Sequence, residues 1–325
     1  MRRVNIELIS SPLKNTFAIS RGAKTSAETV RVTLSDGEHR GRGECVPYAR
    51  YGETPQSVQR QIESVRAALE GGLDLAGLQA ALPAGAARCA VDCALWDLAA
   101  KQAGAPVYAL AGLPEPAPLP TTMTISLDTP EHMALAAQQT PAYLLKLKLG
   151  AEEDLARVEA VHTARPDAKL ILDGNEGLDL RALEGIAARA EHLGIIMIEQ
   201  PLPASGDAAL RGFKTAVPLC ADESVHTHAD MTDIAARYQA VNIKLDKAGG
   251  LTEGLAMVRL ARALGLEIMT GCMVGGSLSM APAFLLGMAC DIIDLDGPLW
   301  LQNDIEDGLV YEDGLVYPPR PALWG

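Results

Sequence analysis

The chain has 325 residues, of which 48% are hydrophobic and 4% aromatic, and its formal net charge is −13. This length suffices for one large domain or two ordinary ones. A core built mainly from aliphatic side chains suits helices packed on a parallel sheet. The negative charge and the absence of any basic cluster in the sequence argue against nucleic acid as a partner, because a phosphate backbone would be repelled.

Membrane insertion and disulfide bonding are also disfavoured by the sequence. No segment approaches the roughly 18 consecutive apolar residues of a membrane span, and the first ten residues lack the apolar run of a signal peptide. The six cysteines form no CxxC pair, and a chain of this size needs no disulfides to fold. We therefore expect a cytoplasmic protein with reduced thiols.

The first hundred residues are predicted to form an α+β unit. Residues 4–10 and 29–35 alternate apolar and polar side chains, which is typical of half-buried antiparallel strands. Residues 54–70 and 85–103 have the apolar spacing of amphipathic helices. The four prolines in residues 114–120 then indicate a linker between two parts of the chain.

Beyond the prolines, short apolar runs alternate with Ala-rich helical segments, and a new run starts roughly every 20–28 residues. Eight such runs alternating with helices predict a (β/α) barrel. A doubly wound open sheet is the alternative, but it does not explain why nearly every run ends in a polar residue. The runs are residues 121–126, 143–149, 169–175, 195–201, 219–224, 240–246, 267–273 and 291–297.

Three carboxylates are expected to meet at one rim, since the carboxyl ends of parallel barrel strands lie together. Asp173, Glu199 and Asp222 end three successive predicted strands. Three converging carboxylates stay ionised only if a cation neutralises them, and oxygen ligands select Mg²⁺ first and Mn²⁺ second. The alternative is that each carboxylate is a solvated loop residue or a helix cap. Three in consecutive units favour the metal site.

A pair of lysines is predicted to point into the barrel. Lys146 and Lys148 are two residues apart and face the same side of their strand, while the alternating leucines face the helices. Each lysine lowers the pKa of the other, as would a nearby metal ion, which suits a general base. The alternative is a pair of lysines on an exposed edge strand.

A further lysine ends the sixth predicted strand, across the barrel from the second. We favour Lys244, which we expect to share a strand face with Asn242 and Asp246. Lys247 is the competing candidate, but we expect it in a loop or at a helix start. Lysines on both sides of a substrate can remove a proton from one face of a carbon and return one to the other. A metal ion on the adjacent carboxylate would stabilise the enediolate that forms.

Several motifs together resemble those of a known family. They are Gly43-Glu44-Cys45-Val46-Pro47, residues 50–54, residues 90–98, Lys146-x-Lys148, Glu199-Gln200-Pro201, Ala221-Asp222-Glu223-Ser224, and Asn242-Ile243-Lys244 with Gly249-Gly250. With these motifs the chain resembles the enolase superfamily, its muconate-lactonizing-enzyme subgroup, and within that subgroup the dipeptide epimerases of the L-Ala-D/L-Glu type.

The resemblance implies a fold and a set of roles. The fold would be a modified (β/α)7β TIM-type barrel over residues 118–302, with an α+β capping domain formed by residues 1–117 and completed by about 303–325. Homo-oligomers are frequent in this family. The implied roles are metal binding for Asp173, Glu199 and Asp222, acid/base catalysis for Lys148 and Lys244, and contact with the substrate carboxylate for Lys146.

The substrate is inferred from other residues. Asp294 and Asp296 share a strand face, and in dipeptide epimerases such an Asp-x-Asp pair binds the α-ammonium group. A glutamyl side chain would need a cation, for which we expect Arg21 on the cap loop, with Lys24 as the alternative. Further expected substrate contacts are Thr122 and Cys272.

The resemblance therefore implies an isomerase that epimerises L-Ala-D-Glu from murein turnover by a 1,1-proton transfer. Other reactions of the subgroup are the alternative: o-succinylbenzoate synthase, N-acylamino acid racemase or cycloisomerase. The Asp-x-Asp pair argues against N-acylated substrates, which lack the ammonium group. A metal-binding barrel without catalysis is the alternative of a different class.

Overall fold

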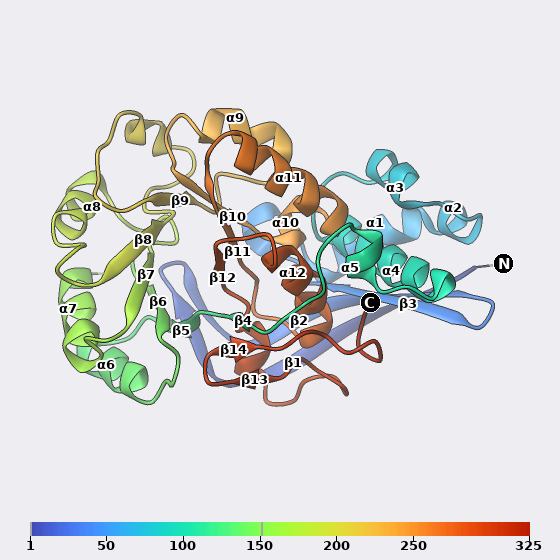
Figure 1. Ribbon diagram of the computed structural model, residues 1–325, viewed down its shortest axis with the longest axis horizontal. Helices are drawn as coiled ribbons and strands as arrows, with labels where there is room; N and C mark the ends of the chain where they lie inside the picture. The colour runs from blue at the N-terminus through green and yellow to red at the C-terminus, as the bar shows by residue number, and fades with distance from the viewer. Residues whose placement is uncertain (1, 151) are drawn as a thin grey trace.

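The computed structural model describes residues 2–150 and 152–325. These residues form a three-stranded antiparallel sheet packed against helices, and an eight-stranded parallel sheet that curls with helices on its outside (Figure 1). The antiparallel sheet and helices α1–α5, called the cap below, lie to the right of the curled sheet in Figure 1. The predicted fold class, a TIM-type barrel with an α+β capping unit, is confirmed, and the open doubly wound sheet is wrong.

The cap begins with three long antiparallel strands and continues with helices. One of these helices, α4, packs so closely on β3 that neither Gly41 nor Gly43 has room for a side chain. A Cβ at Gly43 would lie 2.1 Å from the Ala90 carbonyl oxygen. The predicted helix over 54–70 is broken at Val65 into α1 and α2, and α3 was not predicted. The elements are β1 (Arg3–Ile19), β2 (Gly22–Asp36), β3 (His39–Cys45), η1 (Ala49–Tyr51), α1 (Pro55–Ser64), α2 (Arg66–Glu70), α3 (Leu75–Ala81), α4 (Ala86–Ala103) and α5 (Val107–Leu110).

The parallel sheet runs in chain order from β5 to β12. The backbone N–H of Thr122, just before β5, donates a hydrogen bond to the carbonyl of Ile293 in β12 at 2.8 Å, which joins the first strand segment to the last. The strands are β5 (Met123–Ile125), β6 (Leu144–Lys148), β7 (Lys169–Asp173), β8 (Ile195–Glu199), β9 (Leu219–Ala221), β10 (Ala240–Ile243), β11 (Glu267–Thr270) and β12 (Ile292–Ile293).

Helices follow most strands and cover the outside of the barrel. After β8 only a short 3₁₀ turn, η2, is present, so the predicted alternation is weakest there. In the described part of the chain, no helix is both long enough and apolar enough to cross a membrane. The elements are α6 (Pro130–Gln138), α7 (Asp154–Ala164), α8 (Leu180–Ala187), η2 (Asp207–Leu210), η3 (His228–Asp230), α9 (Met231–Ile234), α10 (Leu245–Ala248), α11 (Leu251–Ala263) and α12 (Ser277–Gly287).

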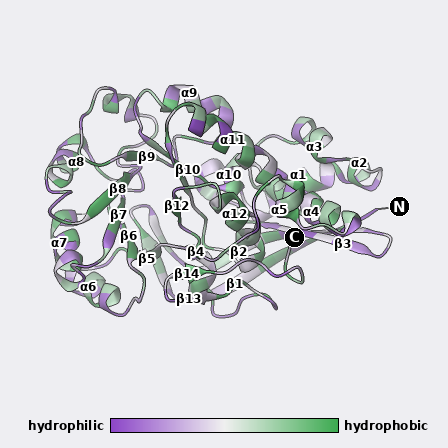
Figure 2. Cartoon of the chain, viewed as in Figure 1, coloured by the Kyte–Doolittle hydropathy of each residue, from purple (hydrophilic) through white to green (hydrophobic). Residues whose placement is uncertain are grey.

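Two apolar layers give the strands their orientation. On β6, Leu145 and Leu147 are fully buried in the main core that includes the outer helices, as the alternation predicts. Figure 2 shows hydrophobic colour along these strands and mixed colour on the surrounding helices. A smaller cluster of buried side chains from adjacent strands gives the barrel a separate apolar layer, and the polar rim lies at the carboxyl ends of the strands. This cluster contains Ile171, Met197, Cys220, Ala240 and Met269.

The C-terminal segment returns to the cap. After η4 (Gly297–Trp300), β13 (Tyr311–Glu312) pairs with β14 (Leu315–Val316), which pairs with β4 (Leu119–Pro120). The indole N–H of Trp324 then donates to the carbonyl of Cys93 in α4 at 3.0 Å. These contacts join the C-terminal segment to β4 and to cap helix α4, and the predicted domain boundaries stay a prediction.

The turn between β1 and β2 crosses from the cap to the barrel (Figure 1). The backbone N–H of Ala18 donates to the Ser126 hydroxyl at 2.8 Å, and the N–H of Leu127 donates to the Ala18 carbonyl at 3.1 Å. The cap thus covers the end of the barrel at which the strands terminate in polar residues.

Candidate active site

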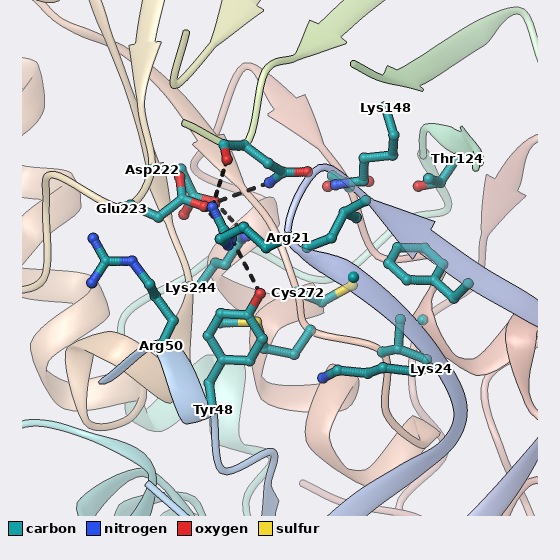
Figure 3. A pocket seen from close by; sticks show the side chains of 18 of the residues that line it. Arg21, Lys24, Tyr48, Arg50, Thr124, Lys148, Asp222, Glu223, Lys244 and Cys272 are labelled. Atoms are coloured by element: carbon teal, nitrogen blue, oxygen red, sulfur yellow. Dashed lines mark hydrogen bonds and ion pairs between the residues drawn. The ribbon is translucent and has the colours of Figure 1, made fainter. Parts of the chain in front are cut away.

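A cavity of about 440 Å³ lies where the cap meets the barrel rim (Figure 3). The β1–β2 turn and the loop around η1 supply its cap side, and the carboxyl ends of the barrel strands supply the rest. Its charged lining residues are Arg21, Lys24, Arg50, Lys146, Lys148, Asp222, Glu223, Lys244, Asp294 and Asp296. Residues more than 270 positions apart in the sequence therefore line one cavity, which suits a small charged ligand.

Two lysines reach this cavity from separate strand ends. Lys148 ends β6, and its Nζ lies 2.6 Å from Oδ2 of Asp173. Lys244 directly follows β10, and its Nζ lies 2.6 Å from Oδ2 of Asp222. Strands β7, β8 and β9 separate the two, so they approach the cavity from different sides of the barrel.

Lys146 lies deeper, among the carboxylates. Its Nζ is 2.7 Å from Oδ2 of Asp294, 2.7 Å from Oε2 of Glu199 and 3.1 Å from Oδ2 of Asp173, and the residue is only 1% exposed. Burial disfavours its charge, but Asp294 and Glu199 outweigh that effect and raise the pKa of Lys146 well above its usual range. Lys146 is therefore a fixed positive charge at the cavity floor.

The three carboxylates differ in their electrostatics. Burial disfavours the charge of Asp173, yet Lys148 and Lys146 lower its pKa below the usual range. Burial likewise opposes the charge of Asp222, and Lys244 lowers its pKa. For Glu199, burial and the neighbouring Asp173 raise the pKa to about 7. At Glu199, the nearby lysines therefore do not fully offset burial and the negative charge of Asp173.

The donor set of these carboxylates fits a hard divalent cation. All three are buried, they come from β7, β8 and the residue after β9, and they offer only oxygen atoms. Oε2 of Glu199 is buried and its contact is the ion pair with Lys146 at 2.7 Å, while Oε1 accepts from the Asn242 amide at 2.7 Å. Within the described ranges, no three His, Cys, Asp or Glu side chains are already grouped as a metal site. The carboxylates contact lysines instead.

The two aspartates at the end of β12 have unequal partners. Oδ2 of Asp294 accepts from Lys146 at 2.7 Å, and its Oδ1 accepts from the Thr122 hydroxyl. Oδ2 of Asp296 accepts from the backbone N–H of Thr124 at 2.7 Å. Burial and the charge of Asp294 raise the pKa of Asp296 to about 6. The indole N–H of Trp300 also donates to Oδ2 of Asp296 at 3.4 Å. Among the described residues Asp296 forms no ion pair, and it lines the cavity, so its negative charge can meet a cationic ligand.

Of the two further expected substrate contacts, Cys272 lines the cavity and Thr122 does not. Thr122 is fully buried, and its hydroxyl donates to Asp294, while Thr124 lines the cavity wall. Substrate contact by Thr122 stays a prediction. Cys272 does line the cavity (Figure 3). Burial raises the pKa of its thiol well above the usual range, which suits a wall residue and not a nucleophile.

The two cations of the cap turn, Arg21 and Lys24, differ in whether a carboxylate pairs with them. Arg21 donates to Oε1 of Glu223 at 2.7 Å (Figure 3). It also donates to Oε2 of Glu176 at 3.1 Å, so its charge is matched within the protein. The Nζ of Lys24 lies 4.9 Å from the centre of the Tyr48 ring, and among the described residues it forms no ion pair. Burial and the charge of Arg21 lower the pKa of Lys24.

The sequence interpretation missed the position of Lys247. It is in α10, near the expected helix start, but it is 3% exposed and its Nζ lies 2.5 Å from Oδ1 of Asp222. Asp246 was expected on a strand face beside Lys244; this is wrong, because β10 ends at Ile243 and Asp246 accepts instead from the N–H of Val46 at 2.8 Å. The three-residue spacing of Lys244 and Lys247 could have predicted this position, because residues three apart lie on the same side of a helical turn.

Two domain families match the chain. The mandelate racemase / muconate lactonizing enzyme N-terminal domain matches residues 3–112, and the enolase C-terminal domain-like family matches residues 131–322. The chain belongs to the enolase superfamily, as the motifs predicted.

Individual relatives agree with this placement. The chain is 46% identical to an L-Ala-D/L-Glu epimerase of Escherichia coli (strain K12), covering 98% of this chain and 100% of that one. It is 42% identical to an N-acetyl-D-glutamate racemase of a Pseudoalteromonas species, covering 90% and 94%. Both are isomerases of amino acid derivatives, which confirms the predicted enzyme class.

Solved structures are similar over nearly the whole chain. An enolase family member from Agrobacterium tumefaciens with homology to dipeptide epimerases, solved with sodium and L-Ala-L-Glu, has a TM-score of 0.98 at 47% identity, with 100% of both chains covered. A dipeptide epimerase from Cytophaga hutchinsonii, complexed with Mg and D-Ala-L-Val, has a TM-score of 0.92 at 27% identity, covering 98% of this chain and 93% of that one.

Proposed function

We propose that this protein is a Mg²⁺-dependent dipeptide epimerase that interconverts L-Ala-D-Glu and L-Ala-L-Glu in murein peptide turnover in the cytoplasm. The observation that carries the proposal is the placement of Lys148 and Lys244, which reach one cavity from different sides above a floor of buried carboxylates. The similarity to dipeptide epimerases over the full chain supports it.

Asp173, Glu199 and Asp222 would hold the metal ion, because they supply buried oxygen donors at neighbouring strand ends. When bound, Mg²⁺ or Mn²⁺ would supply positive charge to the substrate carboxylate and so stabilise the enediolate. Lys146 adds a fixed positive charge at the same floor. Lys146 lines the cavity, so it would contact the substrate carboxylate there.

The two outer lysines would perform the proton transfers. In one direction the Nζ of Lys148 takes the proton from the glutamyl α-carbon and the Nζ of Lys244 returns a proton to the opposite face. In the other direction the roles exchange, as microscopic reversibility requires. The walls from the cap exclude water from the carbanion, since Phe17, Ile19 and Tyr51 line the same cavity.

The ends of the dipeptide would be recognised by opposite charges. Asp296 lines the cavity and forms no ion pair among the described residues, so its carboxylate would bind the alanyl ammonium group, with Asp294 beside it. For the glutamyl side chain, Lys24 is the better candidate of the two cap cations. Arg21 is already matched by Glu223 and Glu176, whereas Lys24 has only the Tyr48 ring.

Racemisation of N-acylated glutamate is the second candidate, since one relative of high identity is an N-acetyl-D-glutamate racemase. It has a structural argument as well: both oxygens of Asp294 are occupied by Lys146 and Thr122, so only Asp296 remains for an ammonium group.

Proton NMR in D₂O with Mg²⁺ separates these functions. With L-Ala-L-Glu we expect the glutamyl α-proton signal to disappear and the L,D epimer to accumulate. N-acetyl-L-glutamate, tested at equal concentration, should exchange far more slowly. Faster exchange with the N-acetylated compound would favour the second candidate, and no exchange with either would refute both. Formation of o-succinylbenzoate or a lactone would favour the other subgroup reactions.

A further inference from the structure

The carboxylate of Asp222 is held by two lysines from opposite edges. Lys244 donates to Oδ2 at 2.6 Å, and Lys247 donates to Oδ1 at 2.5 Å. Lys247 also donates to the backbone carbonyl of Asp222 itself. Asp222 is 1% exposed, so these are the contacts that fix the plane of its carboxylate.

The local sequence explains why both lysines converge. The chain leaves β10 at Ile243 and enters one turn of helix, α10, whose three-residue spacing places Lys244 and Lys247 on the same side. Gly249, with φ of 89°, ends the turn in a left-handed conformation that glycine adopts easily. Arg88 of cap helix α4 then donates to the Ala248 carbonyl at 2.7 Å. The cap therefore fixes the turn that carries both lysines.

The two lysines lie on different sides of Asp222. Lys244 and Asp222 line the main cavity, but Lys247 does not. Lys247 instead lines a second cavity, together with Glu53, His226 and Asp246. A substrate in the main cavity would therefore meet Lys244, while Lys247 would act only through the carboxylate between them.

We propose that Lys247 is a positioning residue that orients Asp222 for metal binding. It holds Oδ1 and the backbone carbonyl, so that Oδ2 keeps its direction toward the main cavity and Lys244. Without the ammonium group, two buried acceptors would lose their partner and the carboxylate would be free to rotate. The inference rests on the proposed function, because it assigns a metal-binding role to Asp222.

The test measures Mg²⁺ binding to the full chain without substrate, by isothermal titration calorimetry. Lys247→Met removes the ammonium group and keeps a chain of similar length. We expect its Mg²⁺ affinity to fall roughly 10- to 100-fold, the usual effect of removing a residue that orients a metal ligand. Lys247→Arg retains the charge and should recover part of the affinity.

Lys101→Met is the matched control, because Lys101 forms a comparable pair with Asp97 at 2.8 Å inside the cap, away from the cavity. It should lower the melting temperature without changing Mg²⁺ affinity. At saturating Mg²⁺, Lys247→Met should slow exchange mainly for the dipeptide epimer whose exchange depends on Lys244. A purely structural role would leave the ratio of exchange rates for the two epimers unchanged.

Mg²⁺ affinity of Lys247→Met within twofold of wild type would overturn the inference, provided that wild type binds the ion. If wild type itself neither binds Mg²⁺ nor catalyses exchange, the proposed function fails and this inference with it. If Lys247→Met does not fold, Lys247→Arg decides. A folded Lys247→Arg variant that binds Mg²⁺ measurably more weakly than wild type supports the inference, since the longer guanidinium cannot hold Oδ1 and the carbonyl of Asp222 in the same way. A folded Lys247→Arg variant with a lower melting temperature but wild-type Mg²⁺ affinity contradicts it.

Discussion

Lys148 and Asp173 are register partners at the ends of neighbouring strands β6 and β7, and the Nζ of Lys148 lies 2.6 Å from Oδ2 of Asp173. Adjacent parallel strands thus deliver a proposed base and a proposed metal ligand to the same level of the barrel. Their charges depend on each other, because Lys148 contributes to the low pKa of Asp173. Replacing Lys148 should therefore raise the pKa of Asp173.

Asp173→Asn should abolish metal-dependent catalysis while leaving the fold intact. The amide is the same size, but it cannot neutralise Lys148 and Lys146 or supply an anionic ligand. We expect Mg²⁺ to stop raising the melting temperature and kcat to fall by at least roughly 100-fold. A thermal denaturation series in Mg²⁺ checks the first effect. An unchanged Mg²⁺-dependent stabilisation would rule out Asp173 as a ligand.

Metal removal should reversibly stop the reaction. Dialysis against a chelator should reduce deuterium exchange to background, and added Mg²⁺ should restore it, with Mn²⁺ as a second active ion. Ca²⁺ serves as the control for a hard ion of larger radius and should restore less activity. Full exchange in chelator would show that the lysines alone suffice, which contradicts the proposed role of the three carboxylates.

Lys24→Met should weaken the selectivity for an acidic side chain. A hydrogen bond to a charged group contributes about 1.5–3 kcal/mol, so KM for L-Ala-L-Glu should rise roughly 10- to 100-fold. KM for L-Ala-L-Leu should change little, because its side chain carries no charge. Arg21→Met is the comparison: Arg21 ties the cap turn to Glu176 and Glu223, so its loss should affect both dipeptides alike. Equal effects of Lys24→Met on both would refute this assignment.

The pKa of about 6 for Asp296 predicts a pH dependence of substrate binding. The charged form binds an ammonium group, so kcat/KM for the dipeptide should fall as pH decreases through about 6. Stability has the opposite trend. The folded-state pKa is raised, so the contribution of Asp296 to stability is complete below the unfolded value of about 3.9 and is lost as pH rises through about 6.

Asp296→Asn is the control for both trends. It should remove this contribution from the pH profile of kcat/KM and make the variant relatively more stable than wild type above pH 6. Urea titrations and initial rates at matched pH values measure the two effects. A wild-type profile that persists unchanged in Asp296→Asn would assign the pH dependence to another group.

The rim of the site was predictable because strand ends are visible in the sequence. Asp173 and Glu199 follow uninterrupted apolar runs, and the alternation in β6 correctly placed its leucines on the helix side and Lys146 inside. Parallel strands then require these ends to meet. Lys244 does line the cavity and Lys247 does not, although the shared strand face with Asp246 that favoured Lys244 is absent, and the catalytic role of Lys244 stays a prediction.

Other features depended on where a strand stops, which a two-residue period does not reveal. The chain turns helical directly after Lys244, so Asp246 does not share a strand face with Lys244, and the helical turn brings Lys247 to Asp222. The pairing of Arg21 with Glu223, 202 residues away, has no local signal either. It arises only when the cap turn meets the barrel rim, and it changes which cation remains for the substrate.

The most direct test of two lysines acting on opposite faces is α-proton exchange by Lys148→Ala and Lys244→Ala, each measured in D₂O with L-Ala-L-Glu and with L-Ala-D-Glu. Each variant should lose epimerisation by roughly 10²- to 10⁴-fold, the usual contribution of a general acid or base. One variant should retain exchange only with the L,L dipeptide and the other only with the L,D dipeptide. Loss of exchange with the same epimer in both variants, or full epimerisation in either, would contradict the account.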